Sequence, residues 1–269
     1  MKTLLSKILN LYIFTNIHVA LSVVSLYLIF NKDIDFNYLI FLFASTIFSY
    51  GFIRIINIES NRKIYKSYYY DYKILFWVIL IISFISTFYT YLKLDLFIQI
   101  TLIPLGLITI FYQTKFQFFS FRQNGILKVL SVGFVWASLV VLLPEIYHFN
   151  DYETILLKFI FVFIYILMLT ISFDQRDVLV DQFELRTLPQ RYSHLKKLIY
   201  FIFFLILFTF IILIYNNVYE LVTAIIVLLF SIILCYNSTE KRGFYYTAFW
   251  IEALPIFWLI INVFTTIIT

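Results

Sequence analysis

The sequence contains a single cysteine, Cys235, and three histidines that lie far apart along the chain. One cysteine excludes a disulfide framework and a metal site of the CxxC type. Charged residues are scarce as well, at 13% of the 269 residues. Because apolar stretches of membrane-spanning length recur along the chain, this composition excludes a water-soluble protein. The sequence therefore predicts an all-α integral membrane protein.

Nine apolar segments are long enough to cross a bilayer core of about 30 Å at a rise of about 1.5 Å per residue. Nothing between them has the composition of a soluble domain or a linker, so we expect one transmembrane domain over residues 1–269. The first segment is too long for the core of a signal peptide, and we expect it to be retained. The expected segments are 8–30, 36–58, 74–92, 95–112, 126–144, 154–173, 198–215, 217–236 and 244–268.

Lysine and arginine are concentrated on one side of this predicted bundle. If the N-terminus and the even-to-odd connections share one side, only Lys32, Lys93 and Lys158 fall on the other. Positive residues favour the cytoplasmic side of short loops. We therefore expect a cytoplasmic (inner) membrane protein whose N-terminus is cytoplasmic and whose C-terminus lies on the opposite side. This topology explains the formal charge of +5 without a nucleic-acid partner.

The stretch FDQRDVLVDQFELRTLPQ, residues 173–190, gathers carboxylates where the sixth segment reaches the cytoplasmic side. If the helix continues through it, Asp174, Asp177, Asp181 and Glu184 fall within an arc of about 80°, while Arg176 points elsewhere. Hard oxygen ligands in this number suit Mg²⁺, which bridges carboxylates to substrate phosphates. The alternative is a solvated helix end with internal Arg–Asp pairs.

DQRDVLVDQFELRTLP resembles the second aspartate-rich motif of the UbiA superfamily of intramembrane prenyltransferases. That family has a D-x-x-D-x-x-x-D run, matched here by Asp174, Asp177 and Asp181, followed by Thr-Leu and often Pro, matched by residues 187–189. The resemblance implies a UbiA-like helical bundle in which these aspartates are catalytic and hold Mg²⁺ against the diphosphate of a prenyl donor. It also implies transfer of the prenyl group to a hydrophobic acceptor, an aromatic quinone precursor.

The first motif of that family, N-D-x-x-D-x-x-x-D after the second helix, is degenerate in SYGFIRIINIESNRKIYKSYYYD. If Asn57 matches the family's asparagine, the aspartate positions fall on Ile58, Asn61 and Tyr65. We expect Arg54, one turn inside the helix end, to neutralise the diphosphate, with Asn57 and Asn61 beside it. The alternative is that the basic residues here only fix topology. The missing carboxylates also support a non-catalytic relative that binds an isoprenoid lipid or a partner protein.

The connection between the fourth and fifth segments, FYQTKFQFFSFRQNGILKV, carries a second basic group. The resemblance implies a tyrosine and a basic residue that face the diphosphate, for which Tyr112, Lys115, Arg122 and Lys128 are the candidates, with a topological role expected for Lys115. The alternative for Lys128 is that its side chain extends to the lipid headgroups. Arg186, among the carboxylates, completes the set of candidate substrate-binding residues.

Glu252, in FWIEALPIFW, lies about 12 Å into the ninth segment. A carboxylate inside a span is costly and is a functional candidate, the alternative being a protonated or paired structural group. Thr15, Asn16 and His18 could line the same cavity, with a hydrogen-bonded core histidine as the expected role of His18. A transporter, the third alternative, would place charges near the midplane on broken helices, whereas most charges here lie at one surface.

Overall fold

The computed structural model describes residues 4–56, 63–113, 124–146, 151–179 and 187–268, and every regular element within these ranges is a helix. Seven helices there are long and apolar enough to span a membrane, or eight if the bent pair α1–α2 counts as one span. The all-α prediction is therefore confirmed for the described residues, and the long apolar helices are compatible with a membrane protein, whereas the count of nine spans stays a prediction. One expected segment corresponds to a shorter apolar helix, Leu96–Tyr112.

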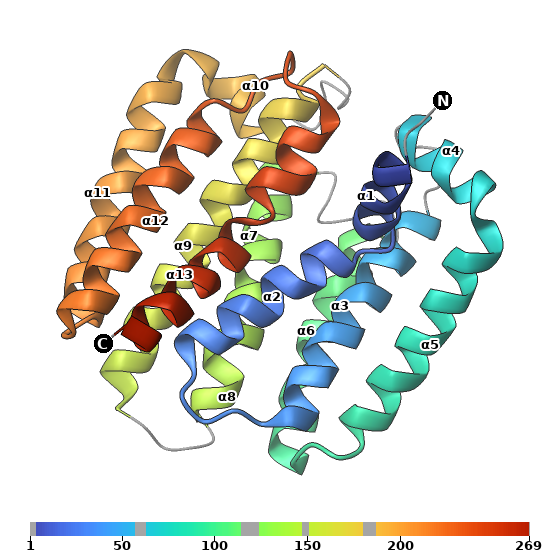
Figure 1. The fold of residues 1–269 in the computed structure, drawn as a ribbon, viewed down its shortest axis with the longest axis horizontal. Coiled ribbons are helices and arrows are strands. Elements are labelled where there is room, and N and C mark those ends of the chain that lie inside the picture. The colour runs from blue at the N-terminus through green and yellow to red at the C-terminus, as the bar shows by residue number, and fades with distance from the viewer. Residues whose placement is uncertain (1–3, 57–62, 114–123, 147–150, 180–186, 269) are drawn as a thin grey trace.

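The long helices run side by side, with α4 and α10 at one end of the bundle and α8 at the other (Figure 1). The helices of the bundle are α2 (Ile17–Phe30), α3 (Phe36–Ile56), α5 (Lys73–Tyr91), α6 (Leu96–Gln113), α7 (Gly125–Ala137), α9 (Tyr152–Asp177), α11 (Lys196–Ile214), α12 (Val218–Tyr236) and α13 (Leu254–Ile268). The shorter elements are α1 (Leu4–Phe14), α4 (Lys63–Asp71), α8 (Leu143–Ile146), α10 (Leu188–Tyr192), the 3₁₀ turn η5 (Ser193–Leu195) and the π-helical turns η3 (Ser138–Leu142) and η6 (Tyr246–Ile251).

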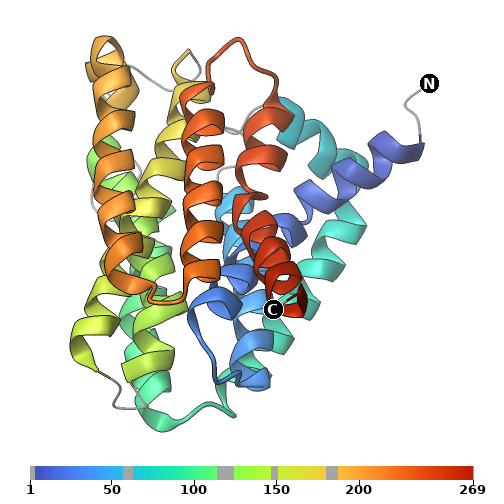
Figure 2. The ribbon, with the colours of Figure 1, turned by 60° about the vertical axis from the view of Figure 1, so that its left-hand side comes forward.

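Contacts between neighbouring helices close a ring. In order around it, α2 packs on α3, α3 on α6, α6 on α7, α7 on α9, α9 on η6 and α12, α12 on α13, and α13 on α2. Helix α5 covers α3 from outside and α11 covers α9, as the two views of the ribbon show (Figures 1 and 2). Cys235, on α12, is fully buried. Because the ring is closed, side chains from helices far apart in sequence face a shared interior.

The first expected segment is not one helix. It bends by 60° between α1 and α2, where Asn16 takes a left-handed conformation with φ 65°. Asparagine is among the few non-glycine residues that adopt this conformation at low cost. The prediction of an unbroken helix over 8–30 was wrong because one residue in this conformation, inside an otherwise apolar run, is enough to redirect the chain.

Two further interruptions are π-helical, and each is followed closely by a proline. Pro144 has no N–H to donate to the carbonyl of Val140, and the side chain of Asn31 donates to that carbonyl instead, at 2.8 Å. Pro255 likewise cannot donate to the carbonyl of Ile251, the last residue of η6. Short π-helical turns inside longer helices often occur at functional sites. Here both lie on the ring that surrounds the interior.

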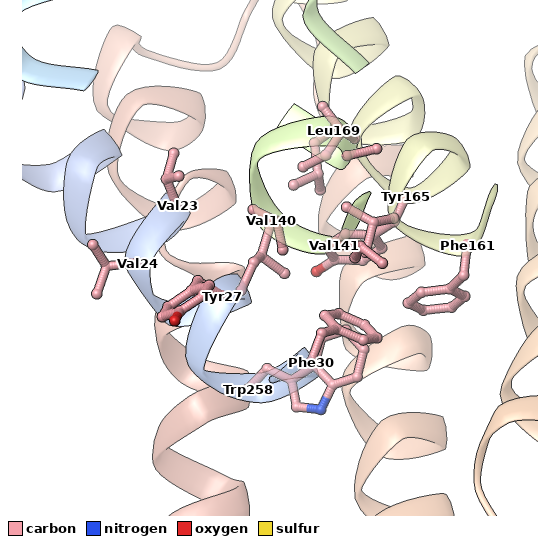
Figure 3. Packing of buried hydrophobic residues seen from close by; sticks show 14 of the residues in the cluster. Val23, Val24, Tyr27, Phe30, Val140, Val141, Phe161, Tyr165, Leu169 and Trp258 are labelled. Carbon is pink, nitrogen blue, oxygen red and sulfur yellow. The ribbon is translucent and has the colours of Figure 1, made fainter. Parts of the chain in front are cut away.

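A cluster of buried hydrophobic side chains, several of them aromatic, packs inside the ring (Figure 3). Trp258 of α13 is 1% exposed, and its ring lies within 6 Å, centroid to centroid, of Phe30, Phe161 and Tyr165. Val140, at the centre of the close-up, is fully buried beside them. This packing ties α2, η3, α9 and α13 together.

Truncation of Trp258 to alanine is expected to destabilise the bundle by roughly 2–3 kcal/mol. The loss comes from the cavity left among the three aromatic neighbours. Transfer from water contributes little, because the unfolded reference state of a protein in a bilayer is surrounded by lipid rather than water. The unfolding free energy would be measured by titration of detergent-purified protein with sodium dodecyl sulfate. Trp258→Phe, which keeps a ring in the cluster, should lose less than half as much, and equal losses would contradict the packing argument.

Candidate functional site

The interior of the ring holds a cavity of about 330 Å³. Its walls come from α2, α3, α6, α7, η3 and α9, together with Glu252 and Pro255 after η6. Most of the wall is aliphatic or aromatic, with hydroxyl groups from several serines and threonines. Charged side chains gather where α3 and α9 end, the same end of the bundle as α4 and α10. The cavity therefore has a charged mouth and a mostly apolar interior.

The structure brings five of the predicted site residues to this mouth. Arg54 from α3, Tyr112 from α6, Lys128 from α7, and Asp174 and Asp177 from α9 all line the cavity. These residues come from four different helices, so their positions along the sequence alone do not determine that they meet. The two carboxylates are three residues apart on one helix face, as the helical spacing predicts.

Each of these two carboxylates lies against a cation. Lys128 Nζ is 2.5 Å from Asp174 Oδ1, and the Asp174 side chain is only 1% exposed. Arg176 donates to Asp177 from Nε at 2.6 Å and from Nη2 at 3.0 Å, so the guanidinium makes a bidentate pair of hydrogen bonds with the carboxylate. The described part of the mouth therefore balances its carboxylates with cations of the chain itself.

The prediction that Arg176 points away from the carboxylates was wrong. Its Nη1 donates to Thr247 Oγ1 at 2.6 Å, and its guanidinium lies 5.2 Å from the ring centre of Phe244 and 5.3 Å from that of Phe173. A long flexible side chain can fold back across the helix end, so the direction of the Cα–Cβ bond alone did not place its charge. Arg176 lines the cavity beside Asp177.

The carboxylate helix is shorter than expected. Helix α9 ends at Asp177 in a turn at Val178 and Leu179, and a separate helix, α10, begins at Leu188. Thr187 caps α10 in an extended conformation, ψ 157°, with a capping box to Gln190, and Pro189 follows in the first turn. An N-cap of this kind is not helical, so one helix cannot run through the whole stretch. The predicted residues Asp181, Arg186, Asn57, Asn61 and Arg122 lie outside the described residues.

Arg54 contacts the main chain at the break between α1 and α2 and also lines the cavity. Its Nη1 donates to the carbonyl oxygen of Phe14, the last residue of α1, at 3.0 Å. Arginine has five N–H donors in a planar fork, so it can bond the main chain and hold other partners as well. Arg54 is thus anchored where α1 ends while its side chain contributes to the cavity wall.

The bent pair α1–α2 and the interruption after η6 lie against each other. His18 Nε2 donates to the carbonyl of Phe249 at 2.9 Å and its Nδ1 accepts from the hydroxyl of Tyr12 at 2.8 Å, while Ser22 Oγ donates to the carbonyl of Glu252. His18 is 2% exposed, so it is the hydrogen-bonded core histidine expected from the sequence. Thr15, Asn16 and His18 do not line the cavity, contrary to the expectation. These main-chain carbonyls are bound by side chains, which disfavours an ion site at the broken helices.

Tyr50 and Glu252 line the cavity from α3 and from the turn after η6. Glu252 was marked from the sequence as an intramembrane carboxylate, and the structure places it in the cavity wall with a half-buried side chain. Tyr50, one turn before Arg54 on the same face of α3, was missed. The signal that could have found it is the helical spacing of four residues from a basic residue already predicted to face the site.

The donor set at the mouth fits Mg²⁺ that arrives with a phosphate. Mg²⁺ is typically held by one or two carboxylates together with substrate phosphate oxygens and waters, and Asp174 and Asp177 supply two carboxylates on one wall of the cavity. Among residues in the described ranges no group of three or more His, Cys, Asp or Glu side chains could hold a metal ion by itself. Within the described ranges the mouth thus offers a metal two carboxylates, and a substrate phosphate could supply further ligands.

Comparison with known proteins gives this chain no relatives: no protein-family model, no curated protein and no solved structure matches it.

Proposed function

We propose that this protein is an intramembrane prenyltransferase, which binds a prenyl diphosphate in the cavity and transfers its prenyl group to a hydrophobic, quinone-precursor-like aromatic acceptor. The observation that carries the proposal is the convergence of Arg54, Tyr112, Lys128, Asp174 and Asp177, from four helices, at the mouth of one apolar cavity. A prenyl diphosphate has the same division, with a highly charged head and a long apolar chain.

The mouth supplies the groups that a diphosphate needs. Arg54, Lys128 and Arg176 can donate charge-assisted hydrogen bonds to phosphate oxygens, and Tyr112 can add a neutral one. Mg²⁺, held by Asp174 and Asp177, would neutralise the diphosphate and help it to depart as a leaving group. When the diphosphate binds, Lys128 and Arg176 would replace their carboxylate partners, Asp174 and Asp177, by phosphate oxygens. This exchange costs less than exposing a bare cation to the cavity.

The interior suits the chain of the donor. Below the mouth the wall includes Val19, Val23, Val132, Ile166 and Leu169, which hold no charge. Val23, Ile166 and Leu169 belong to the same buried core as the aromatic cluster. Such a wall excludes water from the allylic carbon, so that a reactive cation formed there meets the acceptor rather than solvent. Nearby rings, Phe173 and Trp136 among them, could stabilise the positive charge by cation–π contact.

We propose the orientation that the basic residues indicate, with the mouth and the N-terminus on the cytoplasmic side of the inner membrane and the C-terminus on the other. Several long apolar helices are compatible with a membrane protein. The bilayer would then be both the solvent of the protein and the source of the acceptor. Water-soluble diphosphate would reach the mouth from the cytoplasm.

The thermal stability of the detergent-purified protein tests this function directly. Geranylgeranyl diphosphate with Mg²⁺ is expected to raise the unfolding midpoint, by about 2.7 kcal/mol of stability at a hundredfold excess over Kd. In EDTA the rise should disappear, because the carboxylates would then repel the diphosphate. Geranylgeraniol, which has the same chain without the diphosphate, is the matched control. No rise under either condition would contradict the proposal.

A second candidate function is a non-catalytic relative that binds an isoprenoid diphosphate or a similar anionic lipid. The ion pairs Lys128–Asp174 and Arg176–Asp177 favour it, because they balance the described carboxylates of the mouth without a metal. In this case the donor would raise the unfolding midpoint equally with Mg²⁺ and with EDTA. The two candidates are therefore distinguished by one chelator.

A further inference from the structure

Glu252 is set apart from the other acidic residues of the cavity. Asp174 and Asp177 lie against cations at the mouth, whereas the carboxylate of Glu252 makes no hydrogen bond to any described residue. Its main chain is fixed, since Ser22 Oγ donates to its carbonyl oxygen and its N–H donates to the carbonyl of Thr247. The carboxylate lines the cavity and is half-buried because it faces that space.

A carboxylate within a span costs several kcal/mol unless something compensates for it. Arg54 and Arg176 are the cations whose charges act on Glu252. Arg54 donates to the carbonyl of Phe14, and Arg176 donates to Asp177 and Thr247. The two guanidinium groups therefore offset part of the cost of burying the charge, while no described residue donates a hydrogen bond to the carboxylate of Glu252, which lines the cavity.

Aromatic side chains stand beside this carboxylate. Tyr50 lines the same part of the wall, close enough to Glu252 and Arg54 for their charges to act on it, and Trp136 lies next to Tyr50. Aromatic rings in a cavity wall can pack edge to face or offset-stacked against an aromatic ligand. The surroundings thus combine aromatic rings with a carboxylate that can accept hydrogen bonds.

We infer that Glu252 is the carboxylate that binds the acceptor, by accepting a hydrogen bond from an aromatic hydroxyl group. This inference rests on the proposed function for its reaction, though not for its binding chemistry. It divides the cavity between two substrates: an anion at the mouth, recognised by Arg54, Lys128 and the carboxylates of α9, and a neutral hydroxylated ring against Glu252 and Tyr50.

In the transfer, Glu252 takes the hydroxyl proton while a ring carbon of the acceptor forms a bond to the allylic carbon of the donor. The allylic C–O bond breaks, and its electron pair leaves with the diphosphate. The resulting dienone loses the proton from the substituted ring carbon to the departing diphosphate and regains a proton on oxygen from Glu252. The ring is aromatic again, Glu252 is restored, and one C–H bond has been exchanged for one C–C bond.

The binding test compares 4-hexylphenol with 4-hexylanisole, which differ only in that the ether has no hydroxyl proton. The phenol is expected to raise the thermal midpoint of the wild-type protein and the ether to raise it much less. In Glu252→Gln the preference for the phenol should fall about tenfold in Kd, the size of one hydrogen bond to a charged group. Glu252→Asp, which keeps the charge, should restore part of it.

The outcomes separate the two claims. Two results would overturn the inference: equal binding of the phenol and the ether by the wild-type protein, or an undiminished preference for the phenol in Glu252→Gln. The first result is obtained with the wild-type protein alone, so it does not depend on whether the variant folds. Glu252→Gln should keep the Mg²⁺-dependent shift with geranylgeranyl diphosphate, because the donor is held at the mouth. If the wild-type protein shows no such shift but prefers the phenol, the proposed function fails while the site at Glu252 stands.

Turnover gives an additional readout, with radiolabelled geranylgeranyl diphosphate as donor and 4-hexylphenol as acceptor. Glu252→Gln is expected to lower kcat by about a hundredfold, the lower end of the usual contribution of a general base. The KM for the donor should stay within twofold. If Glu252→Gln only destabilised the fold, kcat and the KM for the donor would change together. Such a loss of stability would not explain a recovery of kcat in Glu252→Asp.

Discussion

Replacement of Asp177 by asparagine is expected to lower prenyl transfer by about a hundredfold to a thousandfold, the usual cost of removing one electrostatic group from an active site. Asparagine keeps the size of the side chain and one oxygen but removes the charge that would hold Mg²⁺. The fold should survive, because the amide oxygen of asparagine can still accept from Arg176, which also keeps its bond to Thr247 and its contacts with Phe173 and Phe244. Transfer of label from geranylgeranyl diphosphate to 4-hexylphenol measures the effect.

Asp71→Asn is the matched control. Asp71 is exposed at the end of α4, at the same end of the bundle, but it does not line the cavity. It should transfer label at the wild-type rate. The Mg²⁺-dependent thermal shift should vanish in Asp177→Asn and persist in Asp71→Asn. If Asp177→Asn kept both the shift and the rate, Asp177 would have no part in binding the metal.

Replacement of Lys128 by methionine is expected to destabilise the protein by about 3–5 kcal/mol, the usual cost of leaving a buried charge without its partner. Asp174 is 1% exposed and Lys128 is 14% exposed, so the two partners are not equivalent. In Asp174→Asn the lysine can turn its ammonium group towards the mouth, and the loss should be only about 1–2 kcal/mol. The order of the two losses tests the described geometry independently of any function.

The double variant Lys128→Met with Asp174→Asn should recover most of the lost stability, because it leaves neither charge in the wall. Lys197→Met, at an exposed position on α11, should change the unfolding free energy by less than about 0.5 kcal/mol. Unfolding in sodium dodecyl sulfate would be followed for all four proteins. A larger loss in Asp174→Asn than in Lys128→Met would show that Asp174 is not the more enclosed partner.

The helical architecture could be predicted because long apolar segments have few alternatives in a bilayer, where every main-chain polar group must be satisfied within the element. The interruptions could not. Asn16 takes its left-handed conformation in a context whose hydropathy matches that of an intact span. Pro144 and Pro255 mark the other two breaks, but their effect depends on partners such as Asn31, which lies on a different part of the chain. Long-range contacts of this kind leave no local pattern.

Much of the candidate site could be predicted, though on different grounds. A charged residue near a span end is costly without a partner, which singled out Arg54. Asp174 and Asp177 came from their spacing on one helix face and from the family resemblance, and Lys128 from the resemblance; the structure brings the four together. Arg176 was misplaced because the spacing of Cβ atoms does not determine where a long side chain ends. Neutral members of the wall such as Tyr50 carry no burial penalty that would distinguish them from the many other tyrosines.

The single thiol of the chain has a practical consequence. Cys235 is enclosed between α12 and its neighbours, with no part of its side chain exposed. The native protein is therefore nearly inert to thiol reagents, and a cysteine introduced at the surface would be the reactive one. Ser67 on α4 and Asn217 before α12 are surface positions on opposite ends of the bundle (Figure 1). Each position would be replaced by cysteine in turn, and intact cells would be treated with a maleimide that cannot cross the membrane. Labelling of one cysteine but not of the other would show which end of the protein faces the outside.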